Sequence, residues 1–140
     1  MAIHLFTRKI ASGEPIDVFG DGSAQRDFTF IEDIVDGVVA AFERADDFRI
    51  YNLGRGDTVV LSDVIDLIQQ SLGVEAKINY LPVEPGDVPT TFADVSLARK
   101  ELDYDPKVSI SEGVPRFVEW FRAQEAELTA ATGGESSARS

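Results

Sequence analysis

The residue types best suited to binding an anion lie in one short segment, FGDGSAQRDF at positions 19–28. Arg26 follows a turn with two glycines, and its guanidinium offers a planar, permanently charged fork that matches phosphate oxygens. A neighbouring aromatic ring and the strand backbone could form a flat slot for a base. A second interpretation stays open, in which Arg26 makes a local ion pair with Asp17, Asp21 or Asp27.

A second candidate cluster is the loop PGDV, residues 85–88. Asp87 follows a proline that restricts the backbone, and a carboxylate fixed in this way can accept hydrogen bonds from ribose hydroxyls. Two structural alternatives compete with this role, because Asp87 could instead cap a turn or form an ion pair with Arg26.

The sequence contains no motif for catalysis or for binding a dinucleotide. No G-x-G-x-x-G spacing occurs, so no glycine-rich turn can bring a pyrophosphate against a helix N-terminus. No tyrosine is followed four residues later by lysine. The chain has no cysteine, and His4 is its single histidine, which disfavours a metal site. We therefore expect no catalytic residue, cofactor or metal within this chain.

Charge and hydropathy restrict the possible partners. The formal net charge of −12, from 25 acidic and 13 basic side chains, repels phosphate backbones, so nucleic-acid binding is not expected. No apolar run approaches the roughly 20 residues that span a bilayer, and the N-terminus lacks a signal-peptide pattern. These features predict a soluble, cytoplasmic protein without a membrane partner.

Apolar periodicity predicts helices that would position these clusters. They are expected over residues 2–12, 32–44, 62–72, 94–102 and from Ser109 onward. Ser62 is the expected N-cap of the third, and Gly73 lies where a glycine ends a helix. Ser109 and Glu112 have the spacing of a capping box.

Strands are predicted at residues 15–20, 27–31, 48–54 and 77–83. The first two are expected to form a hairpin around the turn GDGSAQ. The result is a mixed α/β fold with too few strands for a doubly wound sheet. One domain is expected over residues 1–128, followed by a disordered tail over 129–140 with little apolar content.

The sequence resembles the C-terminal half of extended short-chain dehydrogenase/reductases that act on nucleotide sugars. Five segments carry the resemblance in the same order: PIDVFGDGSAQRDFTFIEDIVDGVVAAF, IYNLG, LPVEPGDV, TFADVSLARKEL and ISEGVPRFVEWF. It covers residues 1 to about 122. The stretch 85–114 is most similar to UDP-glucuronate 4-epimerases, with UDP-glucose 4-epimerases close behind.

The resemblance implies a fold and a set of contacts. The chain would be the C-terminal part of an extended Rossmann-type NAD(P)-dependent epimerase/dehydratase, lacking the N-terminal dinucleotide-binding sheet. Arg26 would contact the UDP diphosphate and Asp87 the ribose, while Val18 and Phe19 would lie near the uracil. Asp103 stands where relatives commonly have a glycine that ends a helix.

The implied parent reaction is epimerisation at C4 of UDP-glucuronate or UDP-glucose, with NAD as the hydride carrier. The family's glycine-rich loop and its catalytic residues lie upstream of Met1, so Met1 is expected to be an internal methionine. The chain would then bind a UDP-sugar, be inactive alone, and need the N-terminal NAD-binding part as its partner. The alternative is a non-enzymatic nucleotide-sugar-binding or protein-interaction module that keeps the fold.

The same resemblance predicts an uncovered apolar surface. The helix at 32–44 and the strand at 48–53 are similar to elements that pack on the dinucleotide-binding sheet in the complete family. Their apolar side chains are Val35, Val38, Val39, Phe42, Ile50 and Leu53. We expect several of them to face outward, with self-association to a homo-oligomer, strand exchange or marginal stability as the result.

Overall fold

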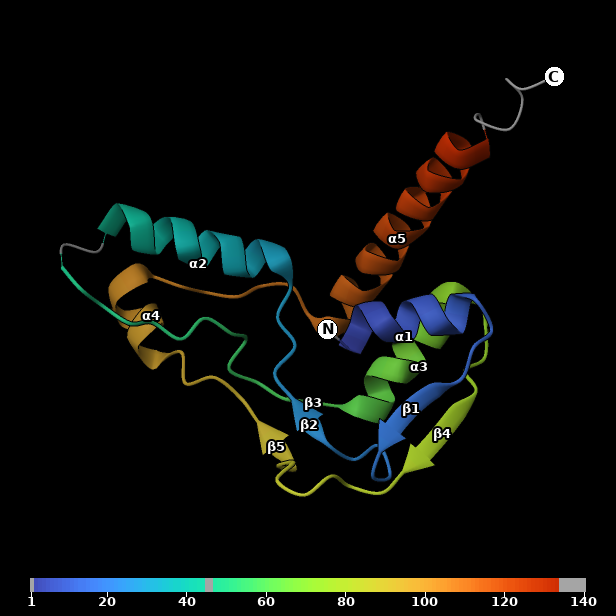
Figure 1. Ribbon diagram of the computed structural model, residues 1–140. Coiled ribbons are helices and arrows are strands. Elements are labelled where there is room, and N and C mark those ends of the chain that lie inside the picture. Colours follow the sequence, from blue (N-terminus) through green and yellow to red (C-terminus); the bar gives the residue numbers. More distant parts are fainter. Residues whose placement is uncertain (1, 45–46, 134–140) are drawn as a thin grey trace.

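The computed structural model describes residues 2–44 and 47–133 of the chain, and its elements are arranged as shown in Figure 1. In chain order they are α1 (Ala2–Ala11), β1 (Ile16–Phe19), β2 (Gln25–Arg26), α2 (Ile31–Arg44), β3 (Val59–Val60), α3 (Leu61–Leu72), β4 (Ile78–Leu81), β5 (Thr90–Thr91), α4 (Ser96–Leu102) and α5 (Ile110–Gly133). The mixed α/β class is confirmed.

The strands form two small sheets. β1 runs parallel to β4, with Ile16 opposite Ile78 and Phe19 opposite Leu81. The other sheet has the order β3-β2-β5, in which β2 is antiparallel to β3 and parallel to β5. The predicted hairpin is therefore wrong, because β1 and β2 belong to different sheets and pair with distant segments.

Residues 48–54 form no strand, contrary to the prediction. A strand exists only where its backbone groups are paired with a neighbour, and the described part of the chain supplies no neighbour for this segment. The predicted strand at 27–31 is also wrong, since β2 ends at Arg26 and α2 begins at Ile31.

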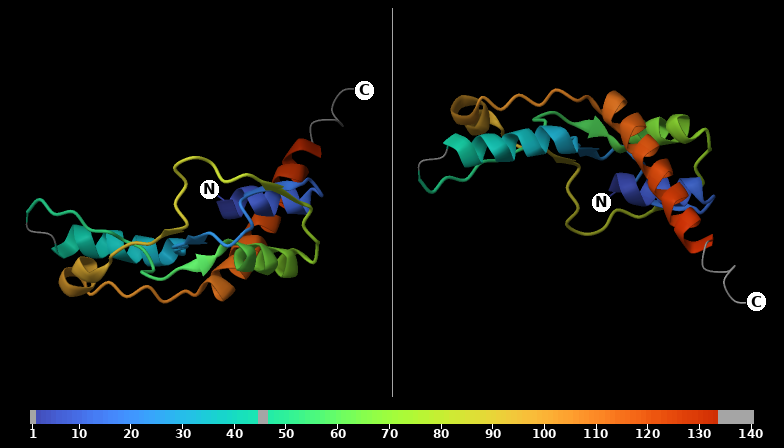
Figure 2. Two further views of the ribbon diagram at one scale, coloured as in Figure 1. Left: turned by 90° about the horizontal axis from the view of Figure 1, so that it is seen from below. Right: turned by 90° about the horizontal axis from the view of Figure 1, so that it is seen from above.

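The larger hydrophobic core joins β1 to α1, α3 and α5, and α5 crosses over α1 and α3 (Figure 2). Its buried side chains are Phe6, Ile10, Ile16, Val18, Val64, Ile65, Ile68, Leu72, Val114 and Val118. Burial of such side chains is the main stabilising contribution to this half of the molecule.

A second, smaller cluster surrounds α4 and has Val95, Ala98, Leu102 and Tyr104 as its buried members. α2 packs here through its small residues, and Ala40 and Ala41 lie against the cluster. Gly37 allows the close approach, because a Cβ atom at this position would lie 2.8 Å from a methyl carbon of Leu53.

The apolar stripe of α2 faces away from the cluster. The buried residues of this helix are Asp33 and Gly37, whereas Val38 and Phe42 are 55% and 91% exposed. The other exposed apolar side chains in this region are Ile31, Val35, Val39, Phe48 and Ile50. Leu53 is the exception among the residues expected to face outward, since it is partly buried against the smaller cluster.

One of the two predicted ends of α3 is confirmed and the other is wrong. α3 begins at Leu61 and not after Ser62, because the N–H groups of Leu61 and Ser62 donate to the carbonyls of Ala24 and Gly22. The backbone of the turn therefore takes the place of a side-chain cap. The predicted glycine terminus is confirmed, with Gly73 in the left-handed conformation at φ 69°.

α5 continues to Gly133, past the point at which a disordered tail was predicted to begin. The sequence AELTAA at 126–131 is rich in strong helix formers, which extends the preceding helix. Residues 134–140 of that predicted tail lie outside the described residues. No helix in the described ranges is both long and apolar enough to cross a bilayer.

Candidate functional site

Arg26 and Asp87, the two charged residues predicted to bind a ligand, meet in the structure. Arg26 lies on β2, the central strand of its sheet, and its Nη2 donates to Asp87 Oδ1 at 2.8 Å. Its Nη1 donates to the carbonyl of Gln25 at 2.8 Å and to that of Pro89 at 3.3 Å. The ion pair with Asp87 is one of the two structural alternatives left open for that residue.

A tight turn presents Asp87 to Arg26. The N–H of Asp87 donates to the carbonyl of Glu84, and Gly86 between them has φ 95°, which glycine adopts without strain. The chain then enters β5, the parallel neighbour of β2. Both partners of the ion pair remain partly exposed, with side-chain exposures of 28% for Arg26 and 39% for Asp87, so a ligand can reach them.

Asp21 is engaged elsewhere in the glycine turn. Its Oδ1 accepts hydrogen bonds from the hydroxyl and the N–H of Ser23, and these bonds hold the pKa of the Asp21 carboxyl below its usual value. The local pairing of Arg26 with a neighbouring aspartate is therefore not the arrangement found. Among the described residues its ion-pair partner is Asp87.

The two apolar candidates lie on opposite faces of β1. Phe19 is 40% exposed, and its register partner Leu81 extends the same apolar surface on β4. Val18 is 1% exposed and packs in the larger core. A base could therefore contact the Phe19 ring but could reach Val18 only through its main chain.

Asp27 was missed as a site residue, although it directly follows Arg26. Its carboxylate accepts hydrogen bonds from the N–H groups of Arg55, Gly56 and Ala93, at 2.9, 2.9 and 3.2 Å. A shallow pocket lies beside it. The residues that line this pocket are Arg26, Asp27, Thr29, Leu53, Gly54, Thr91, Phe92 and Ala93.

Asp33 is a second carboxylate that sequence reasoning missed. It is 5% exposed at the start of α2 and accepts hydrogen bonds from the N–H groups of Lys107 and Val108. The guanidinium of Arg55 donates to the carbonyl of Val108 at 2.8 Å. Asp33 therefore fixes the segment between α4 and α5. The local signal for Asp33 was an acidic residue in the first turn of a helix, which also occurs where no tertiary contact forms.

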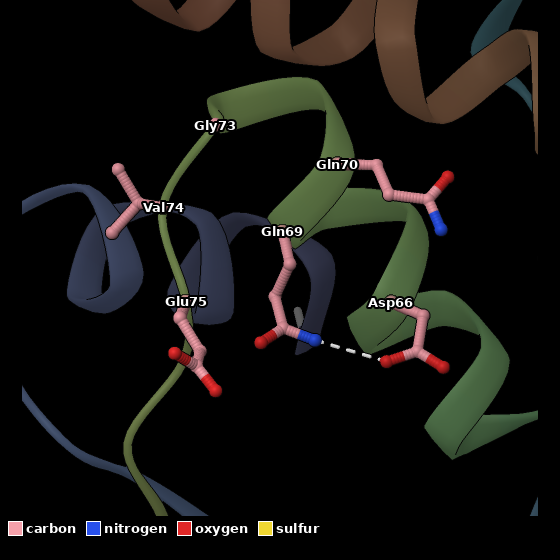
Figure 3. A pocket seen from close by; sticks show the side chains of 6 residues that line it. All are labelled: Asp66, Gln69, Gln70, Gly73, Val74 and Glu75. Carbon is pink, nitrogen blue, oxygen red and sulfur yellow. Dashed lines mark hydrogen bonds between the residues drawn. The ribbon is translucent and has the colours of Figure 1, made fainter.

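A further pocket lies at the end of α3 and is shown in Figure 3. Gln69 Nε2 donates to Asp66, and Gln69 Oε1 accepts from the N–H of Ala76. Its lining, from Asp66 to Glu75, offers carboxylates and amides but no basic side chain. Such a pocket does not suit an anionic ligand. No cluster of three potential metal ligands occurs among the described residues.

Comparisons with known proteins show which sequences and folds the chain resembles. The sequence model of the NAD dependent epimerase/dehydratase family matches residues 1–54. An uncharacterized protein of Methanocaldococcus jannaschii is 44% identical over 86% of the chain, which spans 37% of that protein. A UDP-glucuronate 4-epimerase of Thermodesulfobacterium geofontis is 39% identical, with the same two coverages.

A solved structure shares the fold as well. The UDP-glucose 4-epimerase of Thermotoga maritima, crystallised with UDP-glucose, superposes with a TM-score of 0.80 and 31% identity. The superposition covers 89% of this chain and 40% of that one. The chain thus spans about two fifths of the length of the relatives that it matches. In sequence and in fold, the chain is therefore similar to a part of UDP-sugar epimerases, and its first 54 residues match the NAD dependent epimerase/dehydratase family.

Proposed function

We propose that this chain is the UDP-sugar-binding part of an NAD-dependent nucleotide-sugar 4-epimerase, acting in the epimerisation of UDP-glucuronate or UDP-glucose at C4. The observation that carries the proposal is the meeting of Arg26 and Asp87 at 2.8 Å, from segments 61 residues apart. Each lies in a motif with an expected ligand contact. Their proximity supports a single site for the diphosphate and the ribose.

The roles follow from chemical type. The guanidinium of Arg26 supplies charge-assisted hydrogen bonds to the diphosphate, while the carboxylate of Asp87 accepts from the ribose hydroxyls. The exposed ring of Phe19 offers an apolar face to the uracil. Because Asp87 occupies one edge of the guanidinium, the diphosphate binds at its remaining donors or displaces Asp87.

The start of α3, which follows the β2–β3 pair, does not fit the pyrophosphate of NAD. A dinucleotide is bound where free N–H groups at a helix N-terminus face its pyrophosphate. At the start of α3 the N–H groups of Leu61 and Ser62 are already bonded to the turn at Ala24 and Gly22. We therefore assign ligand positioning to this chain and no step of hydride transfer.

Replacing Arg26 tests the site. Arg26→Ala is expected to weaken UDP binding about ten- to a hundredfold, because a charge-assisted bond contributes roughly 1.5–3 kcal/mol. Uridine binding should hardly change. Calorimetric titration of both ligands against both proteins measures the difference, with Arg8→Ala on the exposed surface of α1 as the charge-matched control. An equal loss for uridine and UDP would show that Arg26 is structural.

An activity assay tests the second part of the proposal. The pure 140-residue chain, supplied with NAD, is expected to form no 4-epimer from UDP-glucuronate or UDP-glucose and to bind NAD weakly. Stoichiometric epimer formation by this chain alone would contradict it.

The second candidate function is a binding module without catalysis. It is favoured by the exposed apolar stripe on α2, which suits a protein partner as well as an N-terminal half. UDP binding by a chain that remains inactive when supplied with an N-terminal half from a relative would favour this module. Restored epimerisation would favour the epimerase part.

A further inference from the structure

The carboxylate of Asp27 connects three segments of the chain. Oδ1 accepts from the hydroxyl of Thr29 at 3.1 Å and from the N–H of Arg55 at 2.9 Å. Oδ2 accepts from the N–H groups of Gly56 and Ala93 at 2.9 and 3.2 Å. An ionised carboxylate accepts such bonds at both oxygens, which neither an amide nor a hydroxyl can do equally well.

The backbone donors lie next to the two strands that flank β2. Arg55 and Gly56 precede β3, and Ala93 follows β5. Each of these strands pairs with β2 over only two residues, so few ladder bonds hold them in register. The Asp27 carboxylate adds bonds on both sides of β2, at the end where the strands separate.

The fit around this carboxylate is close. A Cβ atom at Gly54 would lie 2.8 Å from Asp27 Oδ2 and 2.7 Å from the Cβ of Ala93. Both distances are too short for a side chain. The loop that precedes β3 therefore reaches Asp27 because a glycine stands at position 54.

The position of β5 decides where the guanidinium of Arg26 points. The N–H groups of Gln25 and Asp27 donate to the carbonyls of Pro89 and Thr91, and Arg26 Nη1 donates to Pro89. The side chain of Arg26 is thus hydrogen-bonded to the segment that enters β5. The Asp27 bond to Ala93 continues this series of contacts just beyond the end of β5.

We infer that Asp27 is the positioning residue of Arg26: its carboxylate sets the register of β5 against β2 and so aims the guanidinium at the diphosphate. The inference rests on the proposed function of Arg26. It assigns Asp27 no direct contact with the ligand.

A double-mutant cycle on the full chain tests the inference, with UDP as the probe. Asp27→Asn preserves shape but replaces one acceptor oxygen by a donor. It is expected to weaken UDP binding about tenfold. In an Arg26→Ala background the same substitution should have almost no effect, because no guanidinium is left to aim. The matched control is Asp33→Asn, which removes a similar carboxylate bound to two N–H groups.

The control is expected to lower the melting temperature while leaving the UDP affinity within about twofold. Equal losses from Asp27→Asn in both backgrounds would overturn the inference and make Asp27 a general structural residue. An Arg26→Ala variant that binds UDP as well as wild type would instead overturn the proposed function. If Asp27→Asn does not fold, Thr29→Val replaces it in the cycle. This substitution removes one of the four bonds to Asp27 and also the bond that the Arg55 N–H donates to the Thr29 hydroxyl. The expected loss is then about threefold in the wild-type background and absent in the Arg26→Ala background.

Discussion

Asp103 ends α4 in the left-handed conformation, at φ 53°. It is the only non-glycine residue with positive φ among the described residues, and its carboxylate pairs with Arg44 at the end of α2. An L-residue costs roughly 1–2 kcal/mol in this conformation, whereas glycine adopts it freely. An exposed ion pair contributes about 0–1 kcal/mol in return.

Asp103→Gly is therefore expected to raise the free energy of unfolding, by up to about 1 kcal/mol. Denaturant titration measures the change. Arg44→Ala isolates the contribution of the ion pair, and Asp103→Ala keeps the strain while it removes the pair. A lower stability for Asp103→Gly than for Asp103→Ala would contradict the role assigned to the backbone.

Asp94 provides a prediction about pH. The hydroxyl and the N–H of Ser96 donate to its Oδ1, and these bonds hold the pKa of Asp94 below its usual value. A carboxyl with a lowered folded-state pKa stabilises the fold at neutral pH, and this contribution is lost as the pH falls through that pKa. The difference in melting temperature between wild type and Asp94→Ala should shrink between about pH 5 and pH 2.

Ser96→Ala provides the direct measurement. It removes the hydroxyl bond and keeps the backbone bond, so NMR titration should show a higher pKa for Asp94 in the variant than in wild type. An unchanged pKa would show that the serine hydroxyl does not stabilise the ionised carboxylate.

At the residue scale, Arg26 and Asp87 could be predicted as candidates from their types and neighbours. The bonds of Asp27 and Asp33 could not, because both carboxylates bind backbone N–H groups that are 28 to 75 residues away. Any residue type except proline supplies such a donor, so the partner sequences carry no signal. Gly54 and Gly56, next to Asp27 in space, were the available hint of a close backbone approach.

At the element scale, the helices were predictable because their contacts repeat every three to four residues within one segment. The strands were less predictable from the sequence. β1 and β4 were found from composition, but the partner of each strand depends on segments far along the chain. Residues 48–54 have the composition of a strand and lack a neighbour to pair with in the described part of the chain.

The helix α2 shows why amphipathicity alone does not reveal which face is buried. It packs against the α4 cluster through Gly37, Ala40 and Ala41, whose small side chains allow close approach. The larger side chains lie on the other faces, where Phe42 is 91% exposed. Burying such a side chain against a partner would stabilise the contact by on the order of 1.5–3 kcal/mol.

At the scale of the whole molecule, the stripe on α2 predicts self-association. A contiguous apolar surface favours contact with a second copy, although a net charge of −12 opposes close approach. Light scattering is expected to show an average mass that rises with protein concentration. Replacing Val38 and Phe42 by glutamate should abolish this rise.

A control of equal charge separates apolar contact from general repulsion. Ala123→Glu with Ala126→Glu places the same two charges on the exposed surface of α5 and should leave self-association in place. A monodisperse wild type at all concentrations, with a sharp and high melting transition, would contradict the prediction and favour a self-sufficient module.

The separation of the interior into two clusters has a consequence for how the fold comes apart. The α1–α3–α5 cluster has ten buried members, and the α4 cluster has four. Local opening requires less free energy where fewer apolar contacts break. The region of α2 and α4 would therefore unfold first, as one cooperative unit, while the core of α1, α3 and α5 stays folded. The strands β2 and β5 connect the two regions. A nucleotide bound by Arg26 and Asp87 would stabilise this connection and so raise the cooperativity with which both regions unfold.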